Sequence, residues 1–207
     1  MAAGGSTEFF RTTTVSLLAA AKKAGVPHHV ALSIVGAAAT NGGYYAGKKV
    51  QEDLVAASDT GWTILRATQF HEFIPQTIGR FSAAGVVMVP TMRAQPVAAA
   101  GVAAMLCKLA TGEPQGLAPE IGGPQEERMA EFVRRYLTAT GSRAPVVQLP
   151  LPGRMGRAMR DGTLLPRPRR AARPTRVSPN ARCVTRNDGF RVTHRAFYRR
   201  AVRLAGA

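Results

Sequence analysis

Tyr44 and Lys48 are the residues of this sequence whose types and spacing most directly suggest chemistry. They lie four positions apart at the start of a segment with a helical pattern, so both side chains fall on one helix face. A lysine ammonium beside a phenol favours the phenolate and lowers the tyrosine pKa from about 10. A tyrosine tuned in this way can act as a general acid or base near neutral pH.

Ser33 is the third candidate, near the end of the almost unbroken apolar run at residues 30–35, which is typical of a buried parallel strand. Ligands of open parallel sheets bind outside the carboxyl ends of the strands. We therefore expect Ser33, Tyr44 and Lys48 to converge, with the serine hydroxyl bonded to a carbonyl or hydroxyl of a substrate. The alternative remains open that Tyr44 and Lys48 are ordinary surface residues, because such a pair is common by chance.

The elements that would position these residues alternate between helical and extended patterns. Helices are expected over residues 6–23, 44–57, 73–82, 97–109 and 124–139. Strands are expected over residues 30–35, 62–67, 85–89 and 146–149. This order predicts an α/β fold in which a parallel sheet is flanked by helices and connected by right-handed crossovers.

Apolar periodicity predicts which face of each helix is buried. The first helix would bury Phe10, Thr14, Leu17, Leu18 and Ala21, and the second Tyr45, Val50, Leu54 and Ala57. The helix at 124–139 would begin with Pro124 at its first position and bury Met129, Phe132, Val133, Tyr136 and Leu137. Cys107 is expected in the core, whereas Glu8, Glu52 and Asp53 are expected on solvated faces.

The charge is distributed unevenly along the 207 residues. The chain carries a net charge of +16, of which residues 166–207 contribute +11 through 12 arginines and one acidic residue. Four prolines in this segment exclude a continuous helix at its start, and we expect a disordered basic tail. Its arginines predict nonspecific binding of nucleic acid that weakens with salt.

Composition also excludes some classes of protein. No apolar run approaches the ~18–20 residues of a membrane-spanning helix. Two cysteines cannot form a disulfide framework, so a reducing cytoplasm is expected. The scattered histidines and cysteines have no metal-ligand spacing, and no metal site is predicted.

Three blocks of sequence carry a resemblance to a known family. They are His28-His29-Val30-Ala31-Leu32-Ser33-Ile34-Val35-Gly36, Gly43-Tyr44-Tyr45-Ala46-Gly47-Lys48 and Trp62-Thr63-Ile64-Leu65-Arg66-Ala67-Thr68-Gln69-Phe70. In this order and spacing they resemble the atypical short-chain dehydrogenase/reductase superfamily, and within it the NmrA-like NAD(P)-binding proteins. The resemblance covers about residues 6–165 and implies a partial Rossmann-type domain over residues 1–165, followed by the tail at 166–207.

The same resemblance implies roles for individual residues. Tyr44 would be the proton donor or acceptor, Lys48 would hold the nicotinamide ribose, and Ser33 would steady the substrate or the tyrosine. Thr68, Gln69 and Phe70 would border the nicotinamide and the substrate. The implied cofactor is NAD(P), with NADP the expected form.

The sequence departs from the family pattern at three places. No Gly-rich phosphate-binding turn stands in it, and only 27 residues precede His28, so the nucleotide-binding half is expected to be missing. Gly101 occupies a position where the family usually has an aspartate. The Arg/Pro-rich tail has no counterpart, and its composition would fit a frame-shifted gene end.

The resemblance leaves two functions open. One is an NAD(P)-dependent oxidoreductase acting on a carbonyl, quinone or similar small acceptor, impaired where the missing half is needed. The other is a regulator that binds NAD(P) without turning it over. Because a sheet without its first strands exposes an edge, we also expect a homo-oligomer or a partner that completes the sheet.

Overall fold

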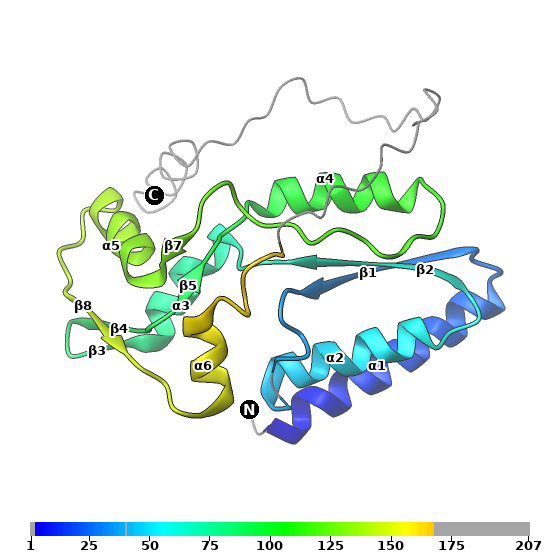
Figure 1. The fold of residues 1–207 in the computed structure, drawn as a ribbon, viewed down its shortest axis with the longest axis horizontal. Helices are drawn as coiled ribbons and strands as arrows, with labels where there is room; N and C mark the ends of the chain where they lie inside the picture. The colour runs from blue at the N-terminus through cyan, green and yellow to red at the C-terminus, as the bar shows by residue number, and fades with distance from the viewer. Residues whose placement is uncertain (1–2, 40, 168–207) are drawn as a thin grey trace.

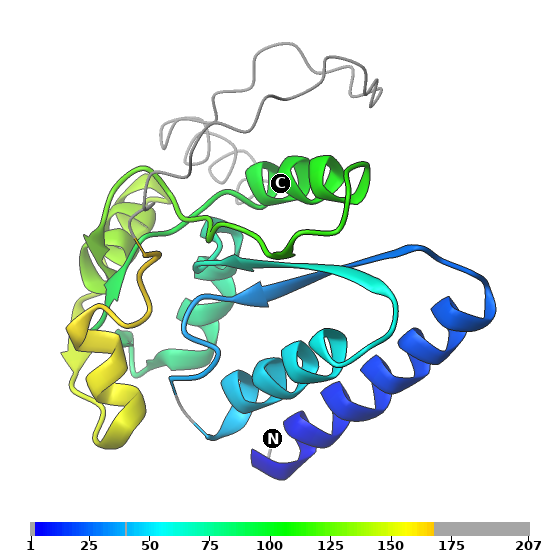
Figure 2. The same cartoon turned by 45° about the vertical axis from the view of Figure 1, so that its right-hand side comes forward.

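A three-layered unit forms the larger part of the fold. The computed structural model describes residues 3–39 and 41–167. Its central sheet has the order β1 (His28–Ile34), β2 (Gly61–Ala67) and β6 (Gly116–Leu117), and all its pairs are parallel. The helices α1 (Ala3–Lys23) and α2 (Gly43–Ala56) cover one face, and α4 (Ala99–Ala110) covers the other (Figures 1 and 2).

The register between β1 and β2 explains how the two faces of this sheet are filled. The strands pair continuously from His28 opposite Gly61 to Ile34 opposite Ala67. Side chains alternate between faces along each strand. Ala31 and Ile64 pack with Val55 beneath α2. The opposite face holds a cluster beneath α4 that comprises Leu65, Ala67, Val97, Val102, Leu109 and Ala118.

A second group of elements lies beyond the carboxyl ends of β1 and β2, at the left of Figure 1. Two small sheets belong to it, with strands β3 (Ser82–Ala83), β4 (Val86–Pro90) and β8 (Val146–Leu149) in one and β5 (Arg93–Ala94) and β7 (Glu127–Arg128) in the other. Its helices are η1 (His71–Phe73, a 3-10 turn), α3 (Ile74–Phe81), α5 (Met129–Ala139) and α6 (Gly153–Asp161). They enclose a separate core around Val87, Val89, Phe132, Val133 and Leu164.

The predicted α/β class with a parallel sheet flanked by helices is confirmed. The face predicted for the first helix needs one correction. Phe10, Thr14 and Leu18 face α2 or the core, whereas Leu17 is 53% exposed. The buried stripe follows the four-residue spacing of Phe10, Thr14 and Leu18, which leaves Leu17 at its solvent-facing edge. Ala57 is also exposed, because α2 ends at Ala56.

The helix predicted at 124–139 begins five residues later than expected. Its first turn starts at Met129, and the preceding Glu127–Arg128 forms strand β7 against β5. The acidic residues that suggested a helix start have other partners: Glu126 binds Arg93, and Glu127 binds Arg135. The predicted apolar face is nevertheless confirmed, since Met129, Phe132, Val133 and Leu137 are buried and Tyr136 packs against them.

Two further expectations about single residues are corrected at α4. Cys107 is exposed rather than in the core, because the buried face of this helix runs through Val102 and Leu109. The helix begins at Ala99, so Gly101 lies in its first turn. Here the backbone N–H of Ala99 donates to both carboxylate oxygens of Glu72 at 3.1 Å. A carboxylate from another element thus meets the positive end of α4.

The described fold does not test two predictions, the basic C-terminal tail and a partner that completes the sheet. Residues 168–207, which carry nearly all of the predicted basic tail, lie outside the described residues. Among the described strands, β1 pairs only with β2, and its other edge is open. A partner at that edge stays a prediction. Within residues 3–39 and 41–167, no helix is long and apolar enough to cross a membrane.

Close packing of α1 on α2 depends on Gly47. A Cβ atom at this position would overlap the Phe10 ring and lie 3.1 Å from the Ser6 carbonyl oxygen. We expect Gly47→Ala to lower the free energy of unfolding by about 1–3 kcal/mol, because overpacking displaces α1. The matched variant Gly101→Ala has open space around its Cβ and should stabilise by about 0.5–1 kcal/mol. Urea unfolding of both variants measures the difference, and equal effects would contradict the packing.

Candidate active site

One cavity of about 240 Å³ lies where β1 and β2 end and α2 begins. It is lined by all six residues singled out in the sequence: Ser33, Tyr44, Lys48, Thr68, Gln69 and Phe70. Leu32 and Ile34 of β1 contribute to its wall, and η1, α3 and α5 close its far side. The convergence expected at the carboxyl ends of the parallel strands is therefore present in the fold.

Lys48 is fixed in this cavity by two hydrogen bonds. Its Nζ donates to the backbone carbonyl of Leu32 and to Oε1 of Gln51, both at 2.9 Å. The ammonium also lies 4.8 Å from the centre of the Phe10 ring and 5.8 Å from that of Tyr44. Such positions over aromatic rings attract a cation. Burial lowers the pKa of Lys48, and the charge of Glu52 opposes this shift.

Tyr44 lies beside Lys48 but does not have the lowered pKa that the spacing suggested. Its ring packs edge-on against Phe10, with centroids 5.6 Å apart, and 51% of the residue is exposed. Burial of the phenol raises the pKa of Tyr44 above its ordinary value. The expectation failed because the ammonium lies over the ring and donates to Leu32 and Gln51. Tyr44 is therefore protonated at neutral pH.

The loop after β2 is held in place by hydrogen bonds to the segment before α4. Thr68 Oγ1 donates to the Gln95 carbonyl at 2.6 Å, and the N–H of Val97 donates to the Gln69 carbonyl at 2.8 Å. The N–H of His71 returns a bond to the Val97 carbonyl at 3.1 Å. The Thr68 hydroxyl is thus occupied by the scaffold, and it positions the loop that carries Gln69 and Phe70.

Polar atoms of Ser33 and Gln69 are buried without a hydrogen bond. Ser33 is 4% exposed and its Oγ has no partner. Both amide atoms of Gln69 are buried in the same way, although the amide lies near enough to the Tyr45 hydroxyl to oppose the rise of its pKa. An unsatisfied buried polar group costs about 1–3 kcal/mol. Such groups lining a cavity are typical of a site that a ligand completes.

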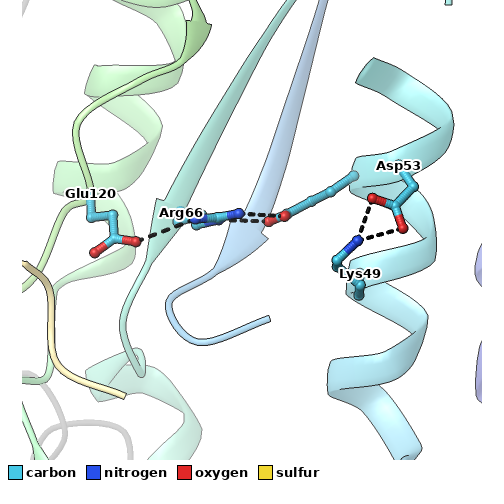
Figure 3. Close-up of polar contacts among 5 residues, drawn as sticks. Lys49, Asp53, Arg66 and Glu120 are labelled. Atoms are coloured by element: carbon cyan, nitrogen blue, oxygen red, sulfur yellow. Dashed lines mark hydrogen bonds and ion pairs between the residues drawn. The ribbon is translucent and has the colours of Figure 1, made fainter. Parts of the chain in front are cut away.

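An ion-pair network ties the site-bearing helix to the sheet (Figure 3). Arg66 on β2 donates from Nε and Nη2 to the two carboxylate oxygens of Glu52 on α2, at 2.8 and 2.7 Å. Its Nη1 lies 3.6 Å from Glu120 in the loop after β6. Glu52 is only 5% exposed, so its expected place on a solvated face is wrong. Glu52 is buried where its carboxylate meets the Arg66 guanidinium between α2 and β2.

A family model described as NAD(P)H-binding matches residues 1–112, more than half of the chain. The chain belongs to this NAD(P)H-binding family. The resemblance to NAD(P)-binding proteins is thereby confirmed at the level of the family. No curated protein matches the chain.

Solved structures share the fold of this NAD(P)H-binding chain. A UDP-galactose 4-epimerase has a TM-score of 0.56 at 18% identity, covering 70% of this chain and 58% of the other. A nucleoside-diphosphate-sugar epimerase from Staphylococcus aureus has 0.56 at 14%, with 75% and 62% covered. The dTDP-glucose 4,6-dehydratase of Streptomyces venezuelae, with NAD and TYD bound, has 0.55 at 19%, with 80% and 63% covered. The chain thus spans about three fifths of their lengths.

The residues present fit the nicotinamide end of such a cofactor. The cavity offers the Lys48 ammonium to the ribose, and the buried polar atoms of Ser33 and Gln69 remain for a second ligand beside the nicotinamide. A lysine ammonium has three donors, of which two are used here. The sequence holds no Gly-rich turn for the pyrophosphate. The fit therefore concerns the nicotinamide and its ribose.

Sequence reasoning missed the residues that close the cavity. Phe73, Ile74 and Thr77 come from η1 and α3, and Met129 and Phe132 from α5. The apolar face of α5 was predicted, and Met129 and Phe132 belong to it. The sequence pattern did not show that this face of α5 turns toward β1 and β2, because that orientation depends on contacts between residues distant in sequence.

The pH dependence of stability tests the burial of the Tyr45 side chain, which lies next to the site. Burial raises the pKa of Tyr45 to about 12, and the neighbouring Tyr44 adds to the rise. Below the unfolded pKa of about 10, Tyr45 is protonated in both the folded and the unfolded state, and the folded state keeps its full stability. As the pH rises from there toward the folded pKa, the unfolded state loses its proton first, and the folded state loses stability relative to it. The free energy of unfolding should therefore fall by up to about 3 kcal/mol more in the parent than in Tyr45→Phe. Urea unfolding between these pH values measures this, and parallel profiles would contradict it.

Proposed function

We propose that this NAD(P)H-binding chain is an oxidoreductase that transfers a hydride between the nicotinamide and a small carbonyl or quinone acceptor. One observation supports it above all. Ser33, Tyr44, Lys48 and Gln69 line a single cavity, and the polar atoms of Ser33 and Gln69 are buried there without hydrogen-bond partners. A cavity with a few convergent polar groups is the usual form of a small-molecule site.

The chain's own residues would divide the work as follows. When bound, NAD(P)H supplies the hydride. The Ser33 hydroxyl would hold the acceptor oxygen, and Lys48 would hold the ribose through its remaining N–H. Tyr44 would give its phenolic proton to the acceptor oxygen as the hydride reaches the carbon, and then recover a proton from water. The raised pKa of Tyr44 suits this role, because it keeps the proton on the phenol at neutral pH.

The contacts of Lys48 and the pKa of Tyr44 favour the alternative function, a regulator that binds NAD(P) without turning it over. The Lys48 ammonium donates to Leu32 and Gln51, and the pKa of Tyr44 is raised rather than lowered. A phenol that resists ionisation is a poor base for the oxidation of an alcohol. Binding of NAD(P) without turnover is therefore the second candidate function.

An absorbance assay of the full chain tests the two candidates. NADPH and NADH are each mixed with cyclic ketones, aldehydes and quinones, and loss of the reduced nicotinamide is followed. Acceptor-dependent loss supports the oxidoreductase. Binding of either cofactor without loss in any mixture would instead support the regulator. The comparison of the two cofactors in this assay also tests the expected preference for NADP.

A further inference from the structure

Gln69 is a polar residue of the cavity whose side-chain amide lies beside the Tyr45 hydroxyl. Its backbone is fixed, because its carbonyl accepts the Val97 N–H at 2.8 Å and the preceding Thr68 is bound to Gln95. Its Nε2 and Oε1 are both buried and, apart from the nearby Tyr45 hydroxyl, have no polar neighbour that satisfies them. A primary amide offers a donor and an acceptor side by side. Gln69 is thus placed to bind a polar group of a ligand.

The rest of the wall restricts what that ligand can be. Apolar side chains dominate it, including Leu32, Ile34, Phe70, Phe73, Met129 and Phe132. The Phe70 and Phe73 rings lie 5.4 Å apart between centroids. Among the described residues that line the cavity, Lys48 is the one with a charge, and its ammonium already donates to two oxygens. A phosphate or carboxylate buried here would lack the paired cations that such anions need.

The size of the cavity adds a second restriction. Its volume of about 240 Å³ lies below the ~300–1,000 Å³ of pockets that hold drug-sized ligands. A nucleotide sugar, with its sugar, diphosphate and nucleoside, is too large and too charged for this space. Because the nicotinamide would also enter this cavity, the space left for an acceptor suits a single small uncharged ring with one polar edge.

We propose that the cavity selects small, uncharged cyclic carbonyl compounds, and that the Gln69 amide and the Ser33 hydroxyl bind their polar edge. This inference rests on the proposed oxidoreductase function and narrows its substrate class. The ring would lie against the apolar wall at Phe70, Phe73 and Met129. Gln69 would then be a specificity-determining residue for the carbonyl group.

Saturation-transfer NMR on the full chain tests the proposal by binding, with and without NADP. The probes are 4-methylcyclohexanone, methylcyclohexane, 4-oxocyclohexanecarboxylate and UDP-glucose. They separate the contributions of the carbonyl, the charge and the size. The variants are Gln69→Leu and, as a matched control, Gln115→Leu, which changes an exposed glutamine before β6.

We expect 4-methylcyclohexanone to bind about tenfold more tightly than the other three probes. Gln69→Leu should remove most of that preference over methylcyclohexane, whereas Gln115→Leu should keep it. The melting temperature of Gln69→Leu should stay close to that of the parent, because the amide gives up only its contact with the Tyr45 hydroxyl. A structural role of Gln69 would instead lower it.

Other results would overturn the proposal. Tighter binding of the carboxylate or of UDP-glucose would contradict the substrate class, and an unchanged preference in Gln69→Leu would contradict the residue. These failures are distinct from failure of the proposed function. If the ketone binds as expected but never oxidises NADPH, the chain binds this class without reducing it. If NADPH is oxidised by charged acceptors only, the oxidoreductase stands and the inference falls.

Discussion

Tyr44→Phe is expected to reduce the rate of hydride transfer to a carbonyl acceptor by about 10²- to 10⁴-fold, the usual contribution of a positioned general acid. The variant keeps the ring that packs against Phe10 and Lys48 but loses the phenolic proton. Binding of NADPH should change little, since Lys48 keeps its bonds to Leu32 and Gln51. The two quantities to measure are kcat by nicotinamide absorbance and Kd by calorimetry.

Tyr136→Phe is the matched control for this prediction. Tyr136 lies on α5 against the second core and does not line the cavity. Its variant should keep the parent rate. The pH profile adds a further check, because the raised pKa of Tyr44 should keep the reduction rate constant up to the ordinary tyrosine value of about 10. A Tyr44→Phe chain with the parent kcat would exclude the phenol as proton donor.

Arg66→Met is expected to lower the free energy of unfolding by about 3–5 kcal/mol. The substitution leaves Glu52, which is 5% exposed, as a buried carboxylate without its two hydrogen bonds. Removing one partner of a buried ion pair costs this much, because the other charge stays buried. Urea unfolding measures the effect.

The double variant Arg66→Met/Glu52→Leu should recover much of the loss, because it removes both charges together. The matched control lies on the same helix in Figure 3, where Lys49 pairs with Asp53 at the surface. Lys49→Met should cost at most about 1 kcal/mol. If Arg66→Met and Lys49→Met had equal effects, the network would not hold α2 on the sheet.

The sequence predicted the parts of the fold that depend on local pattern. The apolar runs of β1 and β2 and the periodic face of α5 are visible in a short window, and each lies where it was expected. The start of α5 was not predicted correctly, because strand pairing of Glu127–Arg128 with Arg93–Ala94 overrides a favourable helix start at Pro124. Pairing partners so distant in sequence leave no mark on the local pattern.

In the site, too, the positions of residues could be predicted from local pattern, whereas their contacts and pKa values could not. Ser33, Tyr44 and Lys48 were placed by strand ends and helix spacing, and all three line one cavity. The pKa of Tyr44 was predicted in the wrong direction, because spacing does not reveal where the lysine's protons point. Glu52 was assigned to solvent, with Asp53 beside it, because acidic residues on a helix usually face water, and its contact with Arg66 explains its burial.

Calorimetry of NADPH and NADH binding to the full chain, at moderate salt, tests the central claim most directly. Lys48→Met and Lys49→Met provide the comparison between a lysine in the cavity and its surface neighbour. The parent and Lys49→Met should bind with equal affinity, and Lys48→Met should bind at least about tenfold more weakly, a loss of about 1.4 kcal/mol. Absence of binding in the parent, or equal affinity in all three chains, would contradict the assignment of this cavity to the nicotinamide end of the cofactor.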